Sequence, residues 1–483
     1  MPCQRAPDEP DESVARPRAL CVDLDGTLLD TDLLYESLLV LLARNPLYLF
    51  LLPFWLLQGK AALKRQIAAR ATIDPCHLPY NPKVLQLLRD TPQRPRVLCT
   101  ASDQLLVAPI AAHLGLFEQI IASDGQHNLS GTRKAQALVD AFGERGFDYA
   151  GNGTVDLAVW ARAAGAWVVN NGSALAGAAA QRTQVLGHWP APSRPQAWLK
   201  ALRPHQWLKN LLVFVPLLTA HRFLEAPAVA DALLAFAAFS LCASGVYVLN
   251  DLLDLDADRR HPRKRHRPFA AGRLPLLHGL VAGPLLTLCG LAVALACGPA
   301  FAAVLAGYYV LTVAYSLRLK RIVMLDVVLL ASLYTLRIIG GTVAIGAELS
   351  FWLLAFSMFI FLSLALLKRY TELHAVLARG KTRANGRGYG VEDLPLLQSL
   401  GAAAGYCAVL VMALYINSPD SVELYRNPKL LWFICPILLY WVSRAWVIAH
   451  RGNMHDDPIV FAATDRASQV VAVLCAGFAL VAI

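Results

Sequence analysis

Acidic residues recur at intervals of three and four residues directly after a long apolar stretch of the sequence. They are preceded by an asparagine and comprise Asn250, Asp251, Asp254 and Asp258. On an α-helix these positions share one face, where carboxylates repel one another unless a divalent cation lies between them. Mg²⁺ takes one or two carboxylates and completes its octahedral coordination with phosphate oxygens and water. The spacing therefore predicts that Asp251, Asp254 and Asp258 bind Mg²⁺ and a diphosphate group.

A basic segment follows these acids at residues 261–272, with the sequence HPRKRHRPFAAG. Lysine and arginine form charge-assisted hydrogen bonds to phosphate oxygens, so we expect Lys264 and Arg267 to neutralise further phosphate charge. The alternative for individual arginines is a solvated loop that only fixes the orientation of the chain in a membrane. This simpler interpretation is favoured for Arg259 and Arg263.

A second pair of acids lies near the start of the chain, in the segment CVDLDGTLLD. Asp23 and Asp25 come at the end of an apolar strand, and Gly26 and Thr27 make the turn that follows. Ligands of open α/β sheets bind at the carboxyl ends of the strands. Two like charges this close favour a bound cation such as Mg²⁺.

The elements that must position these acids fall into two classes. Residues 18–180 alternate short β-branched or leucine-rich runs with longer helical stretches, the rhythm of a parallel sheet, and predict an α/β domain over 1–184. Three prolines in residues 185–200 break both periodicities and predict a linker. Residues 201–483 predict an all-α membrane domain of about nine spans. The expected spans are 210–220, 228–249, 278–297, 299–316, 323–343, 351–367, 398–417, 429–447 and 467–483.

Composition excludes a single soluble globular domain, because 56% of the 483 residues are hydrophobic and only 16% are charged. Basic residues cluster after the second, fourth and sixth expected spans, and such clusters favour the cytoplasmic side. The first twenty residues lack the apolar core of a secretory signal. We therefore expect a multi-pass protein of the cytoplasmic (inner) membrane, with the N-terminal domain in the cytosol. Topology and anionic substrates explain the net charge of +10, so no nucleic-acid partner is expected.

One segment of the α/β domain, residues 38–57, is almost as apolar as a membrane span but contains Arg44, Pro46 and Pro53. A spanning helix there would place the two halves of the α/β domain on opposite sides of the membrane. We therefore favour an interfacial helical hairpin that docks the soluble domain on the bilayer or on the membrane domain.

The DxDGT pattern at residues 23–27 resembles that of the haloacid dehalogenase (HAD) superfamily, and three later segments follow in that family's order. Thr100 matches the hydroxyl that holds the phosphoryl group, and Lys134 matches the charge-neutralising lysine. Asp156 matches the second acid of the fourth motif. The first acid of that motif is replaced here by Asn152, which removes a formal charge from the implied Mg²⁺ site.

This resemblance implies that Asp23 attacks phosphorus to form an aspartyl phosphate, while Asp25 protonates the leaving group and then activates water. It also implies that Asp23, Asp25, Asn152 and Asp156 hold the Mg²⁺ ion and that residues 30–95 form a helical cap. The alternative is a noncatalytic docking or regulatory module on the same fold, for which Asn152 is the support in the sequence.

The NDxxDxxxD motif that begins at Asn250 resembles the UbiA superfamily of intramembrane prenyltransferases, whose nine-helix fold matches the expected number of spans. Residues 203–210, 261–272, 315–326 and 367–373 are similar to the decaprenyl-phosphate phosphoribosyltransferase branch of that superfamily. The branch transfers 5-phosphoribose from phosphoribosyl diphosphate to a polyprenyl phosphate lipid. Members that use prenyl diphosphates carry a second acidic cluster after the sixth span.

In place of that second cluster, this chain has Lys368, Arg369 and a single acid, Glu372, which suits a sugar phosphate better than a second Mg²⁺ ion. The resemblance assigns Asp251, Asp254 and Asp258 to Mg²⁺ and the donor's diphosphate, with Asn250 orienting them. The candidates for binding the donor's 5-phosphate or the lipid phosphate are Lys209, Lys264, Arg267, Lys368 and Arg369.

Three further residues belong to the motif between the fourth and fifth spans: Tyr315, Lys320 and Asp326. The tyrosine and the lysine are placed to meet phosphate oxygens, although Tyr315 is equally explained as an interfacial aromatic anchor. Arg337 is a single charge inside an apolar span, and we expect it to be paired within the helical bundle.

Together these resemblances imply a bifunctional membrane enzyme. Its membrane domain would make a polyprenylphosphoryl 5-phosphoribose, and its α/β domain would remove the 5-phosphate to supply a lipid-linked pentose for an arabinofuranose pathway. The alternative is an aromatic prenyltransferase that uses a prenyl diphosphate donor to make a quinone precursor, with a regulatory or independent HAD domain.

Overall fold

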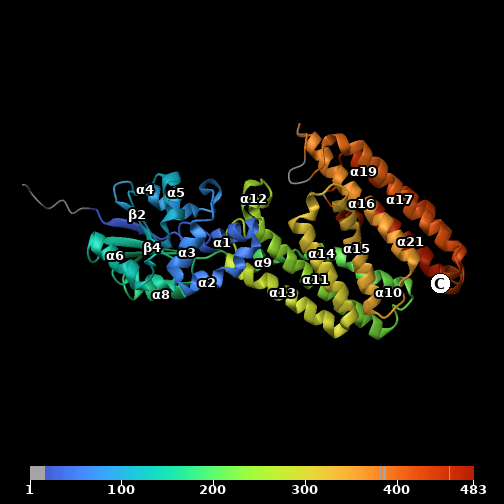
Figure 1. Ribbon diagram of the computed structural model, residues 1–483, viewed down its shortest axis with the longest axis horizontal. Helices are drawn as coiled ribbons and strands as arrows, with labels where there is room; N and C mark the ends of the chain where they lie inside the picture. Colours follow the sequence, from blue (N-terminus) through green and yellow to red (C-terminus); the bar gives the residue numbers. More distant parts are fainter. Residues whose placement is uncertain (1–16, 381, 384–387, 456) are drawn as a thin grey trace, which may run out of the picture. The chain divides into compact units, whose positions relative to one another are not determined.

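The computed structural model describes residues 17–380, 382–383, 388–455 and 457–483 (Figure 1). It divides into two compact units: unit 1 is Met1–Ala201 with Val248–Val281, and unit 2 is Leu202–Tyr247 with Ala282–Ile483. Residues 1–16, on which the expectation of a cytosolic start rests, lie outside the described residues. The same holds for residues 381 and 384–387 in the third basic cluster.

Unit 1 contains a six-stranded sheet in the order β3-β2-β1-β4-β5-β6, in which every neighbouring pair is parallel. The strands are β1 (Ala19–Val22), β2 (Arg96–Asp103), β3 (Gln119–Ser123), β4 (Phe147–Gly151), β5 (Gly165–Val169) and β6 (Gln184–Trp189). This confirms the predicted parallel α/β domain. The chain order reverses beside β1, which places the end of β1 at the point where such sheets bind ligands.

Alternating residues of β1 enter two separate cores, because successive side chains of a strand point to opposite faces. Leu20 and Val22 pack with the helices α4 and α5, while Ala19 and Cys21 pack with α6, α7 and α8. Figure 1 shows α4 and α5 on one side of the sheet and α6 and α8 on the other. The helices are α4 (Pro82–Asp90), α5 (Gln104–Leu114), α6 (Thr132–Phe142), α7 (Leu157–Trp160) and α8 (Ser173–Ala180).

The connection between β1 and β2 is helical. Before α4 it contains α1 (Leu33–Arg44), η1 (Pro46–Phe50), α2 (Leu52–Leu57), α3 (Lys60–Ala68) and η2 (Pro75–His77). Asp32 caps α1 by accepting a hydrogen bond from the backbone N–H of Leu34. The helix ends at Asn45, because Pro46 has no backbone N–H to continue it. The apolar segment 38–57 is therefore three short helical pieces and not one continuous helix.

The predicted linker differs from the structure at its start. Residues 185–189 belong to β6, which pairs with β5 and extends the sheet by one strand. The apolar character of QVLGHW allows this pairing, and the prolines that break it begin only at Pro190. The helix α9 (Pro195–Leu202) follows, so irregular chain is confined to the few residues between β6 and α9.

Seven helical segments among the described residues are long and apolar enough to cross a membrane, and an eighth is a pair of helices bent by 74°. The seven are Ala226–Leu253, Leu276–Cys297, Pro299–Leu317, Leu325–Ala344, Phe351–Leu377, Val391–Ile416 and Pro428–His450, and the bent pair is Pro458–Thr464 with Arg466–Ala482. The chain is thus a multi-pass membrane protein. The remaining expected span, 210–220, forms the 3₁₀ helix η4 (Pro204–Phe214) and the short helix α10 (Val215–Thr219).

The labels of these membrane helices follow the chain order in Figure 1. They are α11 (Ala226–Leu253), α13 (Leu276–Cys297), α14 (Pro299–Leu317), α15 (Leu325–Ala344), α16 (Phe351–Leu377), α17 (Leu394–Ile416), α19 (Ile434–His450), α20 (Pro458–Thr464) and α21 (Arg466–Ala482). Short elements between them are α12 (Leu255–Arg260), η5 (Lys264–His266), η6 (Leu319–Arg321), η7 (Val391–Asp393), α18 (Pro419–Leu424) and η8 (Pro428–Phe433).

The ends of α11 and α13 belong to unit 1 together with the sheet. Leu39 of α1 lies in one buried apolar cluster with Leu252 at the end of α11 and Leu276 at the start of α13. The apolar helix that follows β1 is therefore packed directly against the ends of two membrane-spanning helices.

Candidate functional site

Asp23 and Asp25 lie directly after β1, and both are held in defined positions. The carboxylate of Asp25 accepts hydrogen bonds from the backbone N–H of Leu33 at 2.8 Å and from the hydroxyl of Ser102 at 2.6 Å. Thr100 lies nearby, with its hydroxyl 3.5 Å from the same carboxylate. Burial raises the pKa of Asp23 to about 7 and that of Asp25 to about 6, because a low-dielectric site disfavours the charged form.

Lys134 brings a positive charge to this pair of acids, as its sequence match implied. Lys134 is 4% exposed. Its ammonium group donates hydrogen bonds to Asp23 at 2.8 Å and to the hydroxyl of Tyr149 at 2.9 Å. The Tyr149 hydroxyl donates in turn to Asp156 at 3.1 Å. The lysine therefore lies between two buried carboxylates and offsets part of their mutual repulsion.

Asn152 and Asp156 lie at the end of β4, beside the end of β1 in the sheet. Asp156 accepts hydrogen bonds from the backbone N–H groups of Asn152 and Gly153. A Cβ atom added to Gly26 would come within 2.0 Å of the side-chain nitrogen of Asn152. The turn after β1 thus requires a glycine, and the Asn152 amide lies directly against it.

Several residues of this site were not predicted. Ser102 extends the site because β2 continues to Asp103, past Thr100. Asn170, directly after β5, donates to the carbonyl oxygen of Gly26 at 3.0 Å. Its position after a parallel strand was the signal that would have identified it, since all strand ends meet at one edge.

The acidic motif lies where α11 gives way to α12. Asp251 and Asp258 are 2% and 1% exposed, and one terminal nitrogen of Arg267 lies 3.1 Å from Asp251 and 2.5 Å from Asp258. Lys264 is 3.9 Å from Asp258. Burial raises the pKa of Asp258, and Arg267 opposes that shift. The structure therefore brings together two of the predicted acids and both predicted basic residues. Asn250 lies half-buried within α11.

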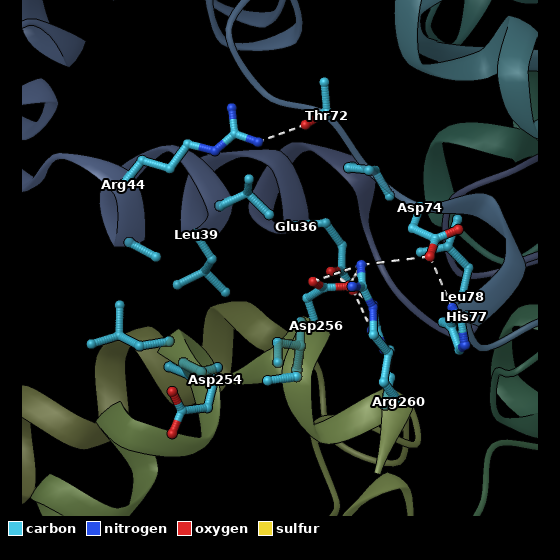
Figure 2. A pocket seen from close by; sticks show the side chains of 18 residues that line it. Glu36, Leu39, Arg44, Thr72, Asp74, His77, Leu78, Asp254, Asp256 and Arg260 are labelled. Carbon is cyan, nitrogen blue, oxygen red and sulfur yellow. Dashed lines mark hydrogen bonds and ion pairs between the residues drawn. The ribbon is translucent and has the colours of Figure 1, made fainter. Parts of the chain in front are cut away.

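Asp254 has a different position from its two neighbours in the motif. It is the residue between α11 and α12, and it lines a cavity of about 510 Å³. Figure 2 shows Asp254 and Asp256 on one wall, and Arg44, Thr72 and Asp74 on the opposite wall. The acids of the motif thus face two environments, an ion-paired cluster and an open cavity.

Arg259 corrects a prediction. It was expected to be a solvated loop residue, yet it is 9% exposed and pairs through both terminal nitrogens with the carboxylate of Glu36 in α1. Arg263, for which the same was expected, is exposed. Charge composition alone does not separate these two arginines, because the partner of Arg259 is 223 residues away in the sequence.

In unit 2, Arg369 of α16 is the centre of a second cluster of predicted residues. Its guanidinium donates to Asp326 at 2.5 Å, to Glu372 at 2.5 Å and to the hydroxyl of Tyr315 at 3.0 Å. Tyr389, which was not predicted, donates to Asp326 at 2.6 Å. Arg369 is 1% exposed. Its guanidinium therefore links α14, α15 and α16 through buried hydrogen bonds and ion pairs.

Lys209 forms another ion pair in unit 2, with a residue that the sequence did not single out. Its ammonium group lies 2.5 Å from Asp457, and both side chains are largely buried. Burial alone would raise the pKa of Asp457, but Lys209 and Lys368 lower it overall. These three charges therefore lie within electrostatic reach of one another. Lys320 is half-buried in η6.

Arg337 pairs within the bundle, as expected. It donates to the side-chain oxygen of Asn210 at 2.8 Å and to the hydroxyl of Tyr308 at 2.7 Å, and it lies over the Tyr308 ring.

Each of the two acidic sites offers only a few side chains that could bind Mg²⁺. Within the described ranges, no group of three or more His, Cys, Asp or Glu side chains is arranged to hold a metal ion. Each site instead offers two carboxylates: Asp23, which is buried, with the half-buried Asp25, and Asp251 with Asp258, which are both buried. Such a pair suits an ion whose remaining ligands are substrate phosphates and water.

Comparison with known proteins gives matches over both parts of the chain. The sequence profile of the UbiA prenyltransferase family matches residues 213–468. A protein of Sinorhizobium fredii, "Uncharacterized protein y4nM", is 39% identical over 464 residues, which cover 95% of this chain and 89% of that protein. The match therefore includes most of the N-terminal α/β region.

Two further relatives match a shorter part of the chain. The nodulation protein NoeC of Azorhizobium caulinodans is 39% identical over 288 residues, 58% of this chain and 92% of that protein. The decaprenyl-phosphate phosphoribosyltransferase of Mycobacterium tuberculosis is 32% identical over 280 residues, 57% of this chain and 90% of that enzyme. Among solved structures, a UbiA homolog from Archaeoglobus fulgidus bound to GPP and Mg²⁺ is 17% identical with a TM-score of 0.46, covering 59% of this chain and 99% of that one.

Proposed function

The chain belongs to the UbiA prenyltransferase family, and we propose that it transfers 5-phosphoribose from phosphoribosyl diphosphate to a polyprenyl phosphate in the membrane. The observation that carries this proposal is the buried pair of Asp251 and Asp258 with Arg267 bound to both. Relatives named decaprenyl-phosphate phosphoribosyltransferase support the choice of donor. Residues 367–373 support this donor further. Their single acid, Glu372, pairs with Arg369, so this segment does not supply the second acidic cluster of the members that use prenyl diphosphates.

Each residue has a defined part in the proposed transfer. Asp251 and Asp258 would hold Mg²⁺, which would supply charge neutralisation for the donor's diphosphate. Asp254, which lines the cavity, is the third acid of the proposed donor site. Arg267 and Lys264 donate to the oxygens of the diphosphate. In unit 2, Lys209, Lys320 and Lys368 bind the lipid phosphate or the 5-phosphate, and Asp457 orients Lys209. Arg369, Tyr315, Asp326 and Glu372 position the helices that carry these groups.

The transfer itself is a displacement at the anomeric carbon. An oxygen of the polyprenyl phosphate bonds to this carbon while the bond from the carbon to the diphosphate breaks, and the electron pair leaves with the diphosphate. The attacking oxygen is already anionic, so the step requires no general base. The chain's contribution is to stabilise the charge that develops on the leaving group, and this is the role of Arg267 and Lys264.

For the α/β domain we propose a phosphatase of the HAD type that removes the 5-phosphate of the lipid product. An oxygen of Asp23 bonds to phosphorus as the bond from phosphorus to the sugar oxygen breaks, and Asp25 gives that oxygen a proton. Water then attacks the aspartyl phosphate, returns a proton to Asp25 and releases inorganic phosphate. Thr100 and Lys134 hold the phosphoryl group, and Ser102 keeps Asp25 oriented.

The donor is tested directly in membranes that contain the full chain. We expect label from phosphoribosyl diphosphate to enter the polyprenyl phosphate lipid, and Asp251→Asn to reduce this incorporation by about a hundredfold, as for the loss of one transition-state contact. In Asp23→Asn the lipid product is expected to retain its 5-phosphate, which adds the mass of one phosphate group. Incorporation from a labelled prenyl diphosphate alone would overturn the proposal in favour of an aromatic prenyltransferase.

A further inference from the structure

A buried ion pair joins the α/β fold to the acidic motif within unit 1. Glu36 lies on the first turn of α1, and Arg259 lies in α12. Their side chains are 4% and 7% exposed, and one of the two contacts measures 3.0 Å. Removing the carboxylate partner of a buried guanidinium leaves an uncompensated buried charge, which is strongly destabilising. The pair therefore fixes the two elements against each other.

Arg259 also contacts the end of the basic segment that follows the acidic motif. Its third nitrogen, Nε, donates to the carbonyl oxygen of Ala270 at 3.0 Å. Two residues later, Gly272 has a φ of +69°, and a Cβ atom added there would lie 2.4 Å from the carbonyl oxygen of Asp30. The α/β fold thus contacts the segment 259–272 at its start through Glu36 and at its end through Asp30.

Arg267 lies between these two points of contact. It is the residue that pairs with Asp251 and Asp258, so its position depends on the path of the segment 259–272. On the other side, Glu36 is held by a hydrogen bond of 2.7 Å from the hydroxyl of Thr31. Thr31 belongs to the turn after β1, which also carries the acids of the phosphatase site.

We propose that Glu36 and Arg259 are positioning residues of the transferase, through which the α/β domain holds the segment 259–272 so that Arg267 meets the donor's diphosphate. This inference rests on the proposed assignment of Asp251 and Asp258 to that diphosphate. It gives the α/β domain a second role, which does not depend on its own phosphatase chemistry. Glu36 and Arg259 both line the cavity of about 510 Å³.

The test compares Glu36→Gln with Asp148→Asn in the full chain. Asp148 is a matched control, because it is also a buried carboxylate paired with an arginine, at 2.5 Å from Arg94, but lies in the sheet. We expect Glu36→Gln to raise the KM for phosphoribosyl diphosphate about tenfold with a smaller change in kcat, as for the loss of one charged hydrogen bond. Glu36→Asp, which keeps the charge, is expected to recover most of the affinity.

Hydrogen exchange gives a readout that a general loss of stability would not produce. In Glu36→Gln we expect faster exchange in residues 261–272 and unchanged exchange in β4 and β5. In Asp148→Asn we expect faster exchange in β4 and β5 and unchanged exchange in residues 261–272. Equal effects of the two variants on KM, or unchanged exchange in 261–272, would overturn the positioning role.

Comparing Asp251→Asn with Glu36→Gln distinguishes a failure of the positioning role from a failure of the proposed function. If Asp251→Asn leaves phosphoribosyl transfer unchanged, the assignment of the diphosphate site is wrong. If Asp251→Asn abolishes transfer while Glu36→Gln behaves like wild type, only the positioning role is wrong.

Discussion

Three arginines with similar sequence surroundings have three different environments. Arg267 is partly exposed and bridges two acids of the motif, Arg259 is buried against Glu36, and Arg369 is buried among two carboxylates and a tyrosine. All three lie beside other basic residues in the sequence, or within two residues of one: Arg260 for Arg259, Arg265 for Arg267 and Lys368 for Arg369. Their partners lie 3 to 223 residues away, and most of them are distant in the sequence, so only tertiary structure distinguishes a phosphate ligand from a positioning residue.

Asn152 provides a prediction at the level of one side chain. It lies against Gly26 at the end of β4, where the HAD resemblance expects a carboxylate. Asn152→Asp adds a negative charge to the site of Asp23, Asp25 and Asp156, and an additional acid strengthens binding of a divalent cation. We expect the Mg²⁺ concentration for half-maximal phosphate release to fall several-fold.

Phosphate release from a soluble sugar phosphate, titrated with Mg²⁺, checks this expectation. Asp23→Asn in the same background should abolish release, which shows that the measured activity belongs to this site. If Asn152→Asp leaves the Mg²⁺ dependence unchanged, the amide is not a ligand. If neither protein releases phosphate, the α/β domain has only a positioning or docking role.

Among the elements, the helical connection after β1 carries an unusual exposed surface. Leu47, Phe50, Phe54 and Leu57 are 65%, 70%, 63% and 85% exposed. Sequence periodicity predicted helices here, and the breaks at Asn45 and Gly59 explain why they are short. The helix α1, which precedes them in the chain, packs on the ends of α11 and α13 through Leu39. We propose that the exposed apolar side chains of η1 and α2 insert into the interfacial region of the membrane.

Photo-crosslinking of the full chain in lipid nanodiscs tests this contact. With p-benzoylphenylalanine at position 54 we expect crosslinks to lipid, because exposed aromatic side chains of interfacial helices lie among the acyl chains. The same probe at position 105, where Leu105 of α5 is 44% exposed, serves as the control and should give none. Crosslinks from position 54 to protein alone would show that the membrane domain, not lipid, covers this surface.

A prediction at the scale of the whole molecule concerns the expected span at 210–220. Within unit 1, Glu36 pairs with Arg259, which follows α11 in the chain. α11 is long and apolar enough to cross a membrane. We therefore propose that the chain crosses the membrane once before α11, between residues 202 and 225, which contain η4 and α10.

The dimensions of η4 and α10 allow this crossing. η4 has 11 residues and α10 has 5. At about 2.0 Å per residue for a 3₁₀ helix and about 1.5 Å for an α-helix, they extend about 30 Å, close to the thickness of the hydrocarbon core.

Labelling with a membrane-impermeant maleimide tests the crossing. After replacement of Cys3 and of the exposed Cys76 and Cys289 by serine, we expect Leu224→Cys and Ser193→Cys to react from opposite sides of sealed vesicles. Both positions are exposed, so access to solvent does not limit the reaction. Labelling of both from one side would mean that η4 and α10 form a re-entrant segment, and the expected number of nine spans would be wrong.

The sequence by itself determined the parallel sheet, the apolar helices and the positions of both acidic motifs, because periodicity and strand-end acids are local signals. It placed Asp23, Asp25 and Lys134 at one site through their order along the chain. Tertiary structure alone decided that β6 extends the sheet, that Asp254 faces a cavity and that Asp457 pairs with Lys209. It also decided that Glu36 holds Arg259. These contacts join residues far apart in the chain, and burial, which makes it costly to remove one partner of such an ion pair, is a property of the folded molecule only.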